Sequence, residues 1–150
     1  MYGSPSLPWR SARAAVLLAV FAVAACSTMS STVVPLQATL SGAAEVPPKE
    51  TAGSGKLEAS FDKTTSLLKW KLTYSGLSGP ASAAHFHGPA MAGANAGVVV
   101  PFSSPASPIE GQATLTPAQA ADLLDGKWYA NVHTAANPGG EIRGQVLPVK

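Results

Sequence analysis

The stretch S-L-L-K-W-K-L-T-Y, Ser66 to Tyr74, decides the fold class of this chain. Its side chains alternate in polarity, with apolar ones on one face (Leu68, Trp70, Leu72, Tyr74) and polar ones on the other (Lys69, Lys71, Thr73). Successive side chains of a β-strand point to opposite faces of the sheet. The alternation therefore predicts an antiparallel strand with one buried face and one solvated face.

Seven further segments show the same short alternation less regularly, and clusters of Gly, Pro, Ser and Asn separate them. We predict strands at 34–40, 55–62, 81–87, 97–102, 109–115, 127–133 and 141–149. About eight short strands at this spacing indicate an all-β fold. The expected architecture is an antiparallel Greek-key β-sandwich, superoxide-dismutase-like or immunoglobulin-like.

One segment breaks the strand pattern: T-P-A-Q-A-A-D-L-L-D-G, residues 116–126. Thr116 is a favoured N-cap, Pro117 suits the first helical position, and Gln119 completes a capping-box pattern. Gly126 can end the helix. We predict one short crossover helix here, packing one of its two leucines on the sheet.

Residues 1–25 have the organisation of an export signal. Arg10 and Arg13 precede an apolar run at 14–25 that has about the length of a signal-peptide core. The run is too short for a comfortable membrane span. We predict that this segment is a targeting signal and forms no part of the fold.

The apolar run ends in V-A-A-C, and Cys26 is the only cysteine of the chain. This tetrapeptide resembles the lipobox of bacterial lipoproteins, which implies lipidation of Cys26 and an exported, membrane-anchored protein on the periplasmic side. Ser27 follows the cysteine, and a residue other than Asp at that place favours the outer membrane. The alternative is an ordinary secretory signal with a chance cysteine, which exports the protein without anchoring it.

Removal of residues 1–25 leaves a short tether at 26–33 and a domain at 34–150, enough for one domain with a core. Both Arg residues of the signal leave with it, so eight Lys and Arg balance eight Asp and Glu in the mature chain. No basic patch argues for a nucleic-acid partner. With one cysteine, the mature chain forms no internal disulfide.

The three histidines of the chain lie on predicted strands: His85 and His87 in A-A-H-F-H-G, and His133 in Y-A-N-V-H-T. Residues two apart on a strand share a face, so the first pair can tilt toward one metal ion. If the two strands are neighbours, all three imidazoles converge and leave a fourth coordination position open. We predict a metal site formed by His85, His87 and His133.

The fourth position has two candidates, Met91 in the Gly-Ala loop and Glu45 in E-V-P-P. Three imidazoles suit copper or zinc, and a thioether favours Cu(I). The sequence shows no convincing general base or substrate pocket for a catalytic zinc, so copper is preferred, zinc is the alternative, and an enzyme is not favoured. H-x-H is a weak motif on its own, and for Glu45 a solvated or capping role is favoured over a ligand role.

Three long motifs carry a family resemblance: L-S-G-A-A-E-V-P-P at 40–48, A-A-H-F-H-G-P-A at 83–90, and W-Y-A-N-V-H-T-A-A-N-P-G-G-E-I-R-G-Q at 128–145. Together they resemble the CHRD domain, which occurs repeatedly in chordin and as a single copy in many exported bacterial proteins. The resemblance implies an all-β domain of about 110 to 120 residues. The usual family form of the loop after H-x-H-G-P-A does not require methionine, which argues against Met91 as a ligand.

A second likeness concerns architecture. Copper–zinc superoxide dismutase also places an H-x-H on one strand and a further copper-binding histidine on a late strand, but its remaining metal ligands and its disulfide have no counterpart here. The expected function is copper binding, handling or electron transfer. The alternatives are a metal-free cell-surface protein-interaction or adhesion module and, less favoured, a dismutase-type redox enzyme.

Overall fold

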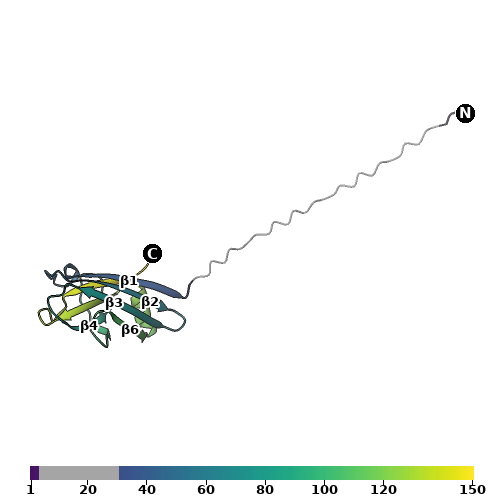
Figure 1. Ribbon diagram of the computed structural model, residues 1–150. Helices are drawn as coiled ribbons and strands as arrows, with labels where there is room; N and C mark the ends of the chain where they lie inside the picture. The colour runs from purple at the N-terminus through teal and green to yellow at the C-terminus, as the bar shows by residue number, and fades with distance from the viewer. Residues whose placement is uncertain (4–30) are drawn as a thin grey trace.

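The structure is a computed structural model that describes residues 1–3 and 31–150 (Figure 1). Residues 4–30, which include most of the predicted signal and Cys26, lie outside the described residues. The ordered elements of the domain are, in sequence, β1 (Val33–Ser41), the 3-10 turn η1 (Gly42–Ala44), β2 (Ser54–Asp62), β3 (Leu67–Ser75), β4 (Ala81–His87), β5 (Val98–Pro101), β6 (Ile109–Thr114), α1 (Pro117–Leu124), β7 (Trp128–Thr134) and β8 (Ile142–Pro148). Each strand agrees with its predicted range to within one residue at either end.

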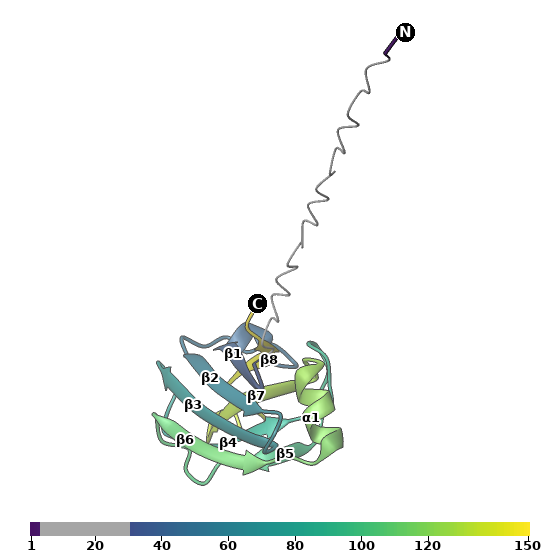
Figure 2. The ribbon, with the colours of Figure 1, turned by 90° about the vertical axis from the view of Figure 1, so that its right-hand side faces the viewer.

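The eight strands form one antiparallel sheet in the order β5-β4-β7-β8-β1-β2-β3-β6. The sheet curls around a single core, and its two edge strands, β5 and β6, come to lie on the same side of the domain (Figure 2). The predicted all-β antiparallel class is therefore confirmed. The predicted sandwich would have two separate sheets. In the structure, each strand from β5 to β6 is hydrogen-bonded to the next in a single sheet.

The stretch that decided the fold class occupies β3, and its predicted faces are correct. Leu68 and Leu72 are fully buried, whereas Lys69 and Lys71 are exposed. Trp70 packs edge-on against Phe86 of β4, with ring centroids 5.2 Å apart, and stacks on Phe102 at 5.0 Å. These aromatic contacts join strands from opposite ends of the sheet, so they help to hold the curled sheet around its core.

The predicted crossover helix is α1. Thr116 accepts a hydrogen bond from the backbone of Gln119, and the Gln119 side chain accepts one from the backbone of Thr116, which completes the capping box. Leu123 is fully buried and Leu124 packs at the edge of the core. No helix among the described residues is long and apolar enough to cross a bilayer.

A buried carboxylate stabilises the end of the sheet where β8 begins. Glu141 is fully buried and accepts hydrogen bonds from the hydroxyls of Thr51, Ser78 and Thr134, each at 2.6 Å, and from the Ser78 backbone at 2.7 Å. Burial alone raises the pKa of this carboxyl, but the hydrogen bonds dominate and lower its pKa to about 2. Glu141 therefore stays ionised and ties two loops and the end of β7 to the start of β8.

Candidate metal site

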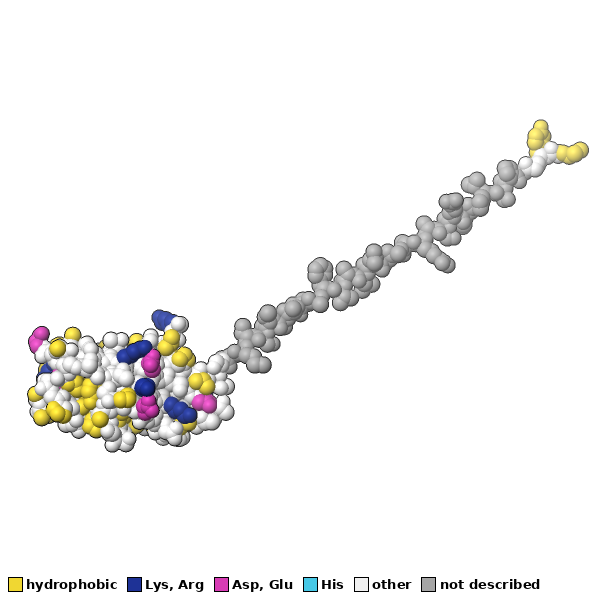
Figure 3. All heavy atoms as spheres, viewed as in Figure 1, with side chains coloured by type: hydrophobic (Ala, Val, Ile, Leu, Met, Phe, Trp, Pro, Cys, Tyr) yellow, Lys and Arg dark blue, Asp and Glu magenta, His cyan; other side chains and the backbone are white. Residues whose placement is uncertain are grey.

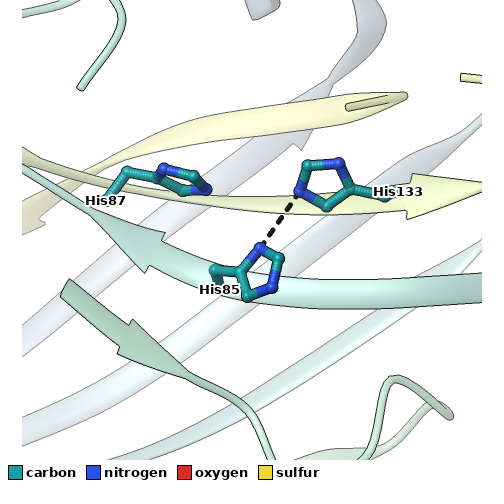
Figure 4. Close-up of side chains that lie close together, drawn as sticks. All are labelled: His85, His87 and His133. Carbon is teal, nitrogen blue, oxygen red and sulfur yellow. Dashed lines mark hydrogen bonds between the residues drawn. The ribbon is translucent and has the colours of Figure 1, made fainter. Parts of the chain in front are cut away.

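The antiparallel pairing of β4 with β7 brings the three histidines together. In this register His85 lies opposite Asn131 and His87 opposite Tyr129. His133 follows Asn131 by two residues and so shares its face. The result is that one face of two neighbouring strands presents three imidazoles to a common point, as Figure 4 shows.

The distances fit a shared ion. His85 Nδ1 lies 3.2 Å from His133 Nε2, and one nitrogen from each of the three imidazoles lies within 4.8 Å of the others. Nitrogen ligands about 2.0 to 2.1 Å from a tetrahedral ion lie about 3.3 Å apart, so small side-chain rotations complete such a site. His87 and His133 are buried, and His85 is partly exposed, which leaves the group a route to solvent.

A side-chain oxygen lies beside the three imidazoles as a possible fourth ligand. The Asn131 side-chain oxygen lies 3.0 Å from His87 Nε2 and 2.9 Å from His133 Nε2, and Asn131 is almost fully buried. The outer nitrogens of the same two rings face backbone carbonyls: His87 Nδ1 lies 3.0 Å from the Ala96 oxygen, and His133 Nδ1 lies 2.9 Å from the Pro138 oxygen. Carbonyl oxygens accept and never donate, so both rings carry their proton on Nδ1.

This tautomer leaves Nε2 of both rings as a lone pair aimed at an oxygen lone pair. Neutral imidazoles in that arrangement have no proton to place between His87, His133 and Asn131. Two changes relieve the conflict: a cation bound among the three atoms, or a half-turn of the Asn131 amide that brings its NH2 group to face the rings. The outer hydrogen bonds are those that orient metal-binding histidines in proteins.

Electrostatics favour the neutral form of His85 and His87. Burial is the main cause that lowers the pKa of His85, and the neighbouring His133 and His87 lower it further. Burial also lowers the pKa of His87, and the hydrogen bonds to Ala96 and Asn131, which raise it, do not cancel this effect. Neutral imidazole is the form that binds a metal.

Residues 36–146 match the CHRD domain. The chain belongs to the CHRD domain family. The resemblance expected from the sequence motifs is thereby confirmed, and the match includes all three histidines. No curated protein and no solved structure matches the chain.

In this CHRD domain an aromatic and cationic stack supports His87 from behind. The Tyr129 ring lies parallel to the His87 ring, with centroids 4.8 Å apart and planes 2° from parallel. The guanidinium carbon of Arg143 lies 3.4 Å from the centroid of the Tyr129 ring. Arg143 also donates to Asn95 Oδ1 at 2.8 Å and to the Ala94 carbonyl. The stack fixes the plane of the His87 ring, and the hydrogen bonds of Arg143 hold the loop between β4 and β5 in place.

The structure describes both predicted candidates for the fourth ligand, Glu45 and Met91. Glu45 does not belong to the group of side chains that could hold one ion. Met91 is exposed on the loop between β4 and β5, with 61% of its surface accessible, and a ligand role for it stays a prediction. The oxygen in contact with Nε2 of both His87 and His133 is that of Asn131.

The solvated role favoured for Glu45 is wrong, because its side chain is 4% exposed. Its Oε1 has no hydrogen-bond partner, and a Cβ at Gly140 would overlap this oxygen. Burial raises the pKa of Glu45, and the charge of Arg143 acts in the opposite direction. Because Gly140 has no side chain, the Glu45 carboxyl fits beside it. The turn motif E-V-P-P gave no reason to expect that Glu45 is buried.

Sequence reasoning did not identify Asn131 as a site residue. A signal for it was present, because the alternation in W-Y-A-N-V-H puts Asn131 on the same face as His133. The same alternation puts Tyr129 on that face, but the stacking of Tyr129 on His87 and the contacts of Arg143 had no local signal. They depend on strand register and on the path of the loop, which become visible only in three dimensions.

Proposed function

We propose that this CHRD protein is exported and lipid-anchored and binds copper through His85, His87 and His133, with a role in copper binding, handling or electron transfer. The observation that carries the proposal is a cluster of lone pairs that face one another, on Nε2 of His87, Nε2 of His133 and the Asn131 side-chain oxygen. Nδ1 of each ring already faces a backbone carbonyl. A cation at this point satisfies all of them at once.

The donor set supports copper over zinc. Three imidazole nitrogens and one amide oxygen suit Cu(II) or Zn(II), and a given site of nitrogen and oxygen donors binds Cu(II) more tightly than Zn(II) in the general order of metal affinities. Zinc is the alternative ion. With the Asn131 oxygen as fourth donor instead of the Met91 thioether, which would have favoured Cu(I), we expect Cu(II) at this site.

The lipid anchor rests on the V-A-A-C sequence at Val23 to Cys26. β1 begins at Val33, seven residues after that cysteine, so a short tether leads directly into the first strand. Lipidation on Cys26 would hold the metal site close to a membrane surface.

The decisive experiment is equilibrium titration of the purified protein with Cu(II) and, separately, Zn(II). Wild type is expected to bind one ion, and the variant with His85, His87 and His133 all changed to alanine is expected to lose that binding. Because the triple variant contains no histidine, residual binding in it measures all other sites. Glu45→Gln and Met91→Leu leave the imidazoles intact and test the two predicted fourth ligands. Equal affinity of wild type and a folded triple variant would falsify the metal site.

The competing function is a metal-free cell-surface module that binds another protein. It requires no ion at the histidines, since an Asn131 amide turned so that its NH2 group faces His87 and His133 would satisfy both rings. The orientation of this amide separates the two proposals. Nitrogen-15 chemical shifts of the histidine rings, recorded before and after addition of Zn(II), report whether Nε2 accepts from an amide or binds the ion.

A further inference from the structure

A strip of apolar side chains lies on the outer face of the sheet where β1 begins and β8 ends. It consists of Val33, Pro35, Leu147 and Val149, and we call it the apolar strip. All four are exposed, with 43% accessible surface at Val33, 48% at Leu147 and 44% at Val149. The Val149 amide donates to the Pro35 carbonyl at 3.0 Å, and Leu147 pairs with Gln37, so the members sit side by side on neighbouring strands.

The part of this outer face formed by β2 and β3 is polar. The exposed residues of β2 and β3 are Ser54, Lys56, Glu58, Lys69, Lys71, Thr73 and Ser75. Figure 3 shows Lys, Asp and Glu side chains dispersed over the face formed by β1, β2 and β3. Solvated faces of antiparallel sheets normally carry such residues. The apolar strip is a local departure from that pattern.

The position of the strip identifies what covers it. Val33 is the first residue of β1 and follows Cys26 by seven residues, which span at most about 25 Å when fully extended. A lipid on that cysteine therefore keeps the strip within about 25 Å of the membrane interface. We propose that the apolar strip lies on the phospholipid surface of the membrane that holds the anchor; this rests on the lipid anchor of the proposed function.

In this arrangement the lipid supplies attachment and the strip sets orientation. An apolar contact at the interface adds to the binding that the lipid supplies. The strip lies at the end of β8, whereas Arg143 of the histidine site lies near its start, four residues and about 13 Å away along the strand. Arg143 and Leu147 lie on the same side of β8, so a strip resting on the bilayer holds the histidine site on the same outer face, about 13 Å along the strand.

The chain offers a direct test because its one cysteine is the proposed lipid attachment point. In the mature lipidated protein a Leu147→Cys variant carries a single free thiol for a nitroxide spin label. Thr73→Cys, exposed on β3, is the matched control. The protein is reconstituted in vesicles of phosphatidylethanolamine and phosphatidylglycerol, and collision rates with oxygen and with a water-soluble nickel chelate are measured.

The label at 147 is expected to show several-fold higher oxygen accessibility and several-fold lower nickel accessibility than the label at 73. Val149→Cys is a second variant if the first perturbs folding. Equal nickel accessibility at both positions, with protein that floats with the vesicles, overturns the strip while leaving the anchor standing. Protein that does not float overturns the anchor and the strip together. Protection at 147 that rises with the protein-to-lipid ratio shows a second copy on the strip and also overturns the proposal.

Discussion

His85 Nδ1 lies 3.2 Å from His133 Nε2, although 48 residues separate the two histidines in the chain. Burial is the main cause that lowers the pKa of His85, and the nearby His133 imidazole is the second. His85 is therefore neutral, and able to bind a metal, at a pH where ordinary histidines begin to take up protons.

The first prediction concerns pH. The folded-state pKa values of His85 and His87 lie below the ordinary value of 6.5, so protons compete with a metal only at pH below that value. Copper affinity is expected to be nearly constant from pH 8 to about 6.5 and to fall as the pH drops further. Titrations at half-unit intervals measure this. An affinity that falls steeply between pH 8 and 7 would contradict it.

The second prediction concerns Asn131. Asn131→Leu removes the oxygen that lies 2.9 and 3.0 Å from two imidazoles, and copper affinity is expected to fall by about 10 to 100-fold. Asn131→Asp keeps an oxygen there and adds a negative charge, so it should bind at least as tightly as wild type. Binding that is unaffected in a folded leucine variant would show that the amide is not a donor. Far-ultraviolet circular dichroism controls for folding.

The third prediction tests the core. Trp70→Ala removes an indole that packs on Phe86 and Phe102 and is expected to lower the free energy of unfolding by about 3 to 5 kcal/mol. Lys71→Ala, on the opposite face of β3, removes an exposed ion pair with Glu110 and should cost less than about 1 kcal/mol. Urea denaturation measures both. Similar small effects at the two positions would mean that the faces of β3 are misassigned.

The fourth prediction concerns Glu141. Its pKa is about 2 in the folded protein and about 4.5 when unperturbed, so its stabilising effect is fully present above pH 4.5 and is lost as the pH falls toward 2. Glu141→Gln is expected to cost about 2 kcal/mol at pH 7. In this variant the loss of stability between pH 4.5 and 3 should be smaller than in wild type. Denaturant midpoints at each pH provide the measurement, and parallel pH profiles of the two proteins would exclude the assigned role.

The fifth prediction concerns the anchor. Cys26→Ala is expected to release the protein into a soluble exported fraction or to block its processing, because the lipid attachment site is gone. Ser27→Ala changes the neighbouring residue and keeps the cysteine, so it is the control for membrane attachment. Membrane fractionation followed by immunoblotting measures both. If the Cys26→Ala variant stays with the membranes as wild type does, V-A-A-C is not a lipobox.

Much of the fold could be predicted because its signals are local. The alternation in β3 and the capping box at Thr116 each depend on neighbouring residues, and both agree with the structure. The shared face of His85 and His87 follows in the same way from strand geometry. These features need no knowledge of which strands pair.

The remainder of the site depends on long-range pairing. Convergence of His133 with the other two histidines requires β4 and β7 to be neighbours, which periodicity alone cannot establish. The burial of Glu45 depends on Gly140, almost a hundred residues away, and E-V-P-P read by itself resembles an exposed turn. The stack of Arg143 on Tyr129 likewise requires β7 and β8 to be in register.

The central place of β1 in the sheet has a mechanical consequence. β1 follows the N-terminal segment directly and is bonded on both sides, to β2 over nine residue pairs from Val33 to Ser41 and to β8 near the C-terminus. A pull on the N-terminal end, along the strand, loads these hydrogen bonds in parallel instead of opening them one after another. The domain should therefore resist tension applied at its anchored end more strongly than tension that peels an edge strand such as β6.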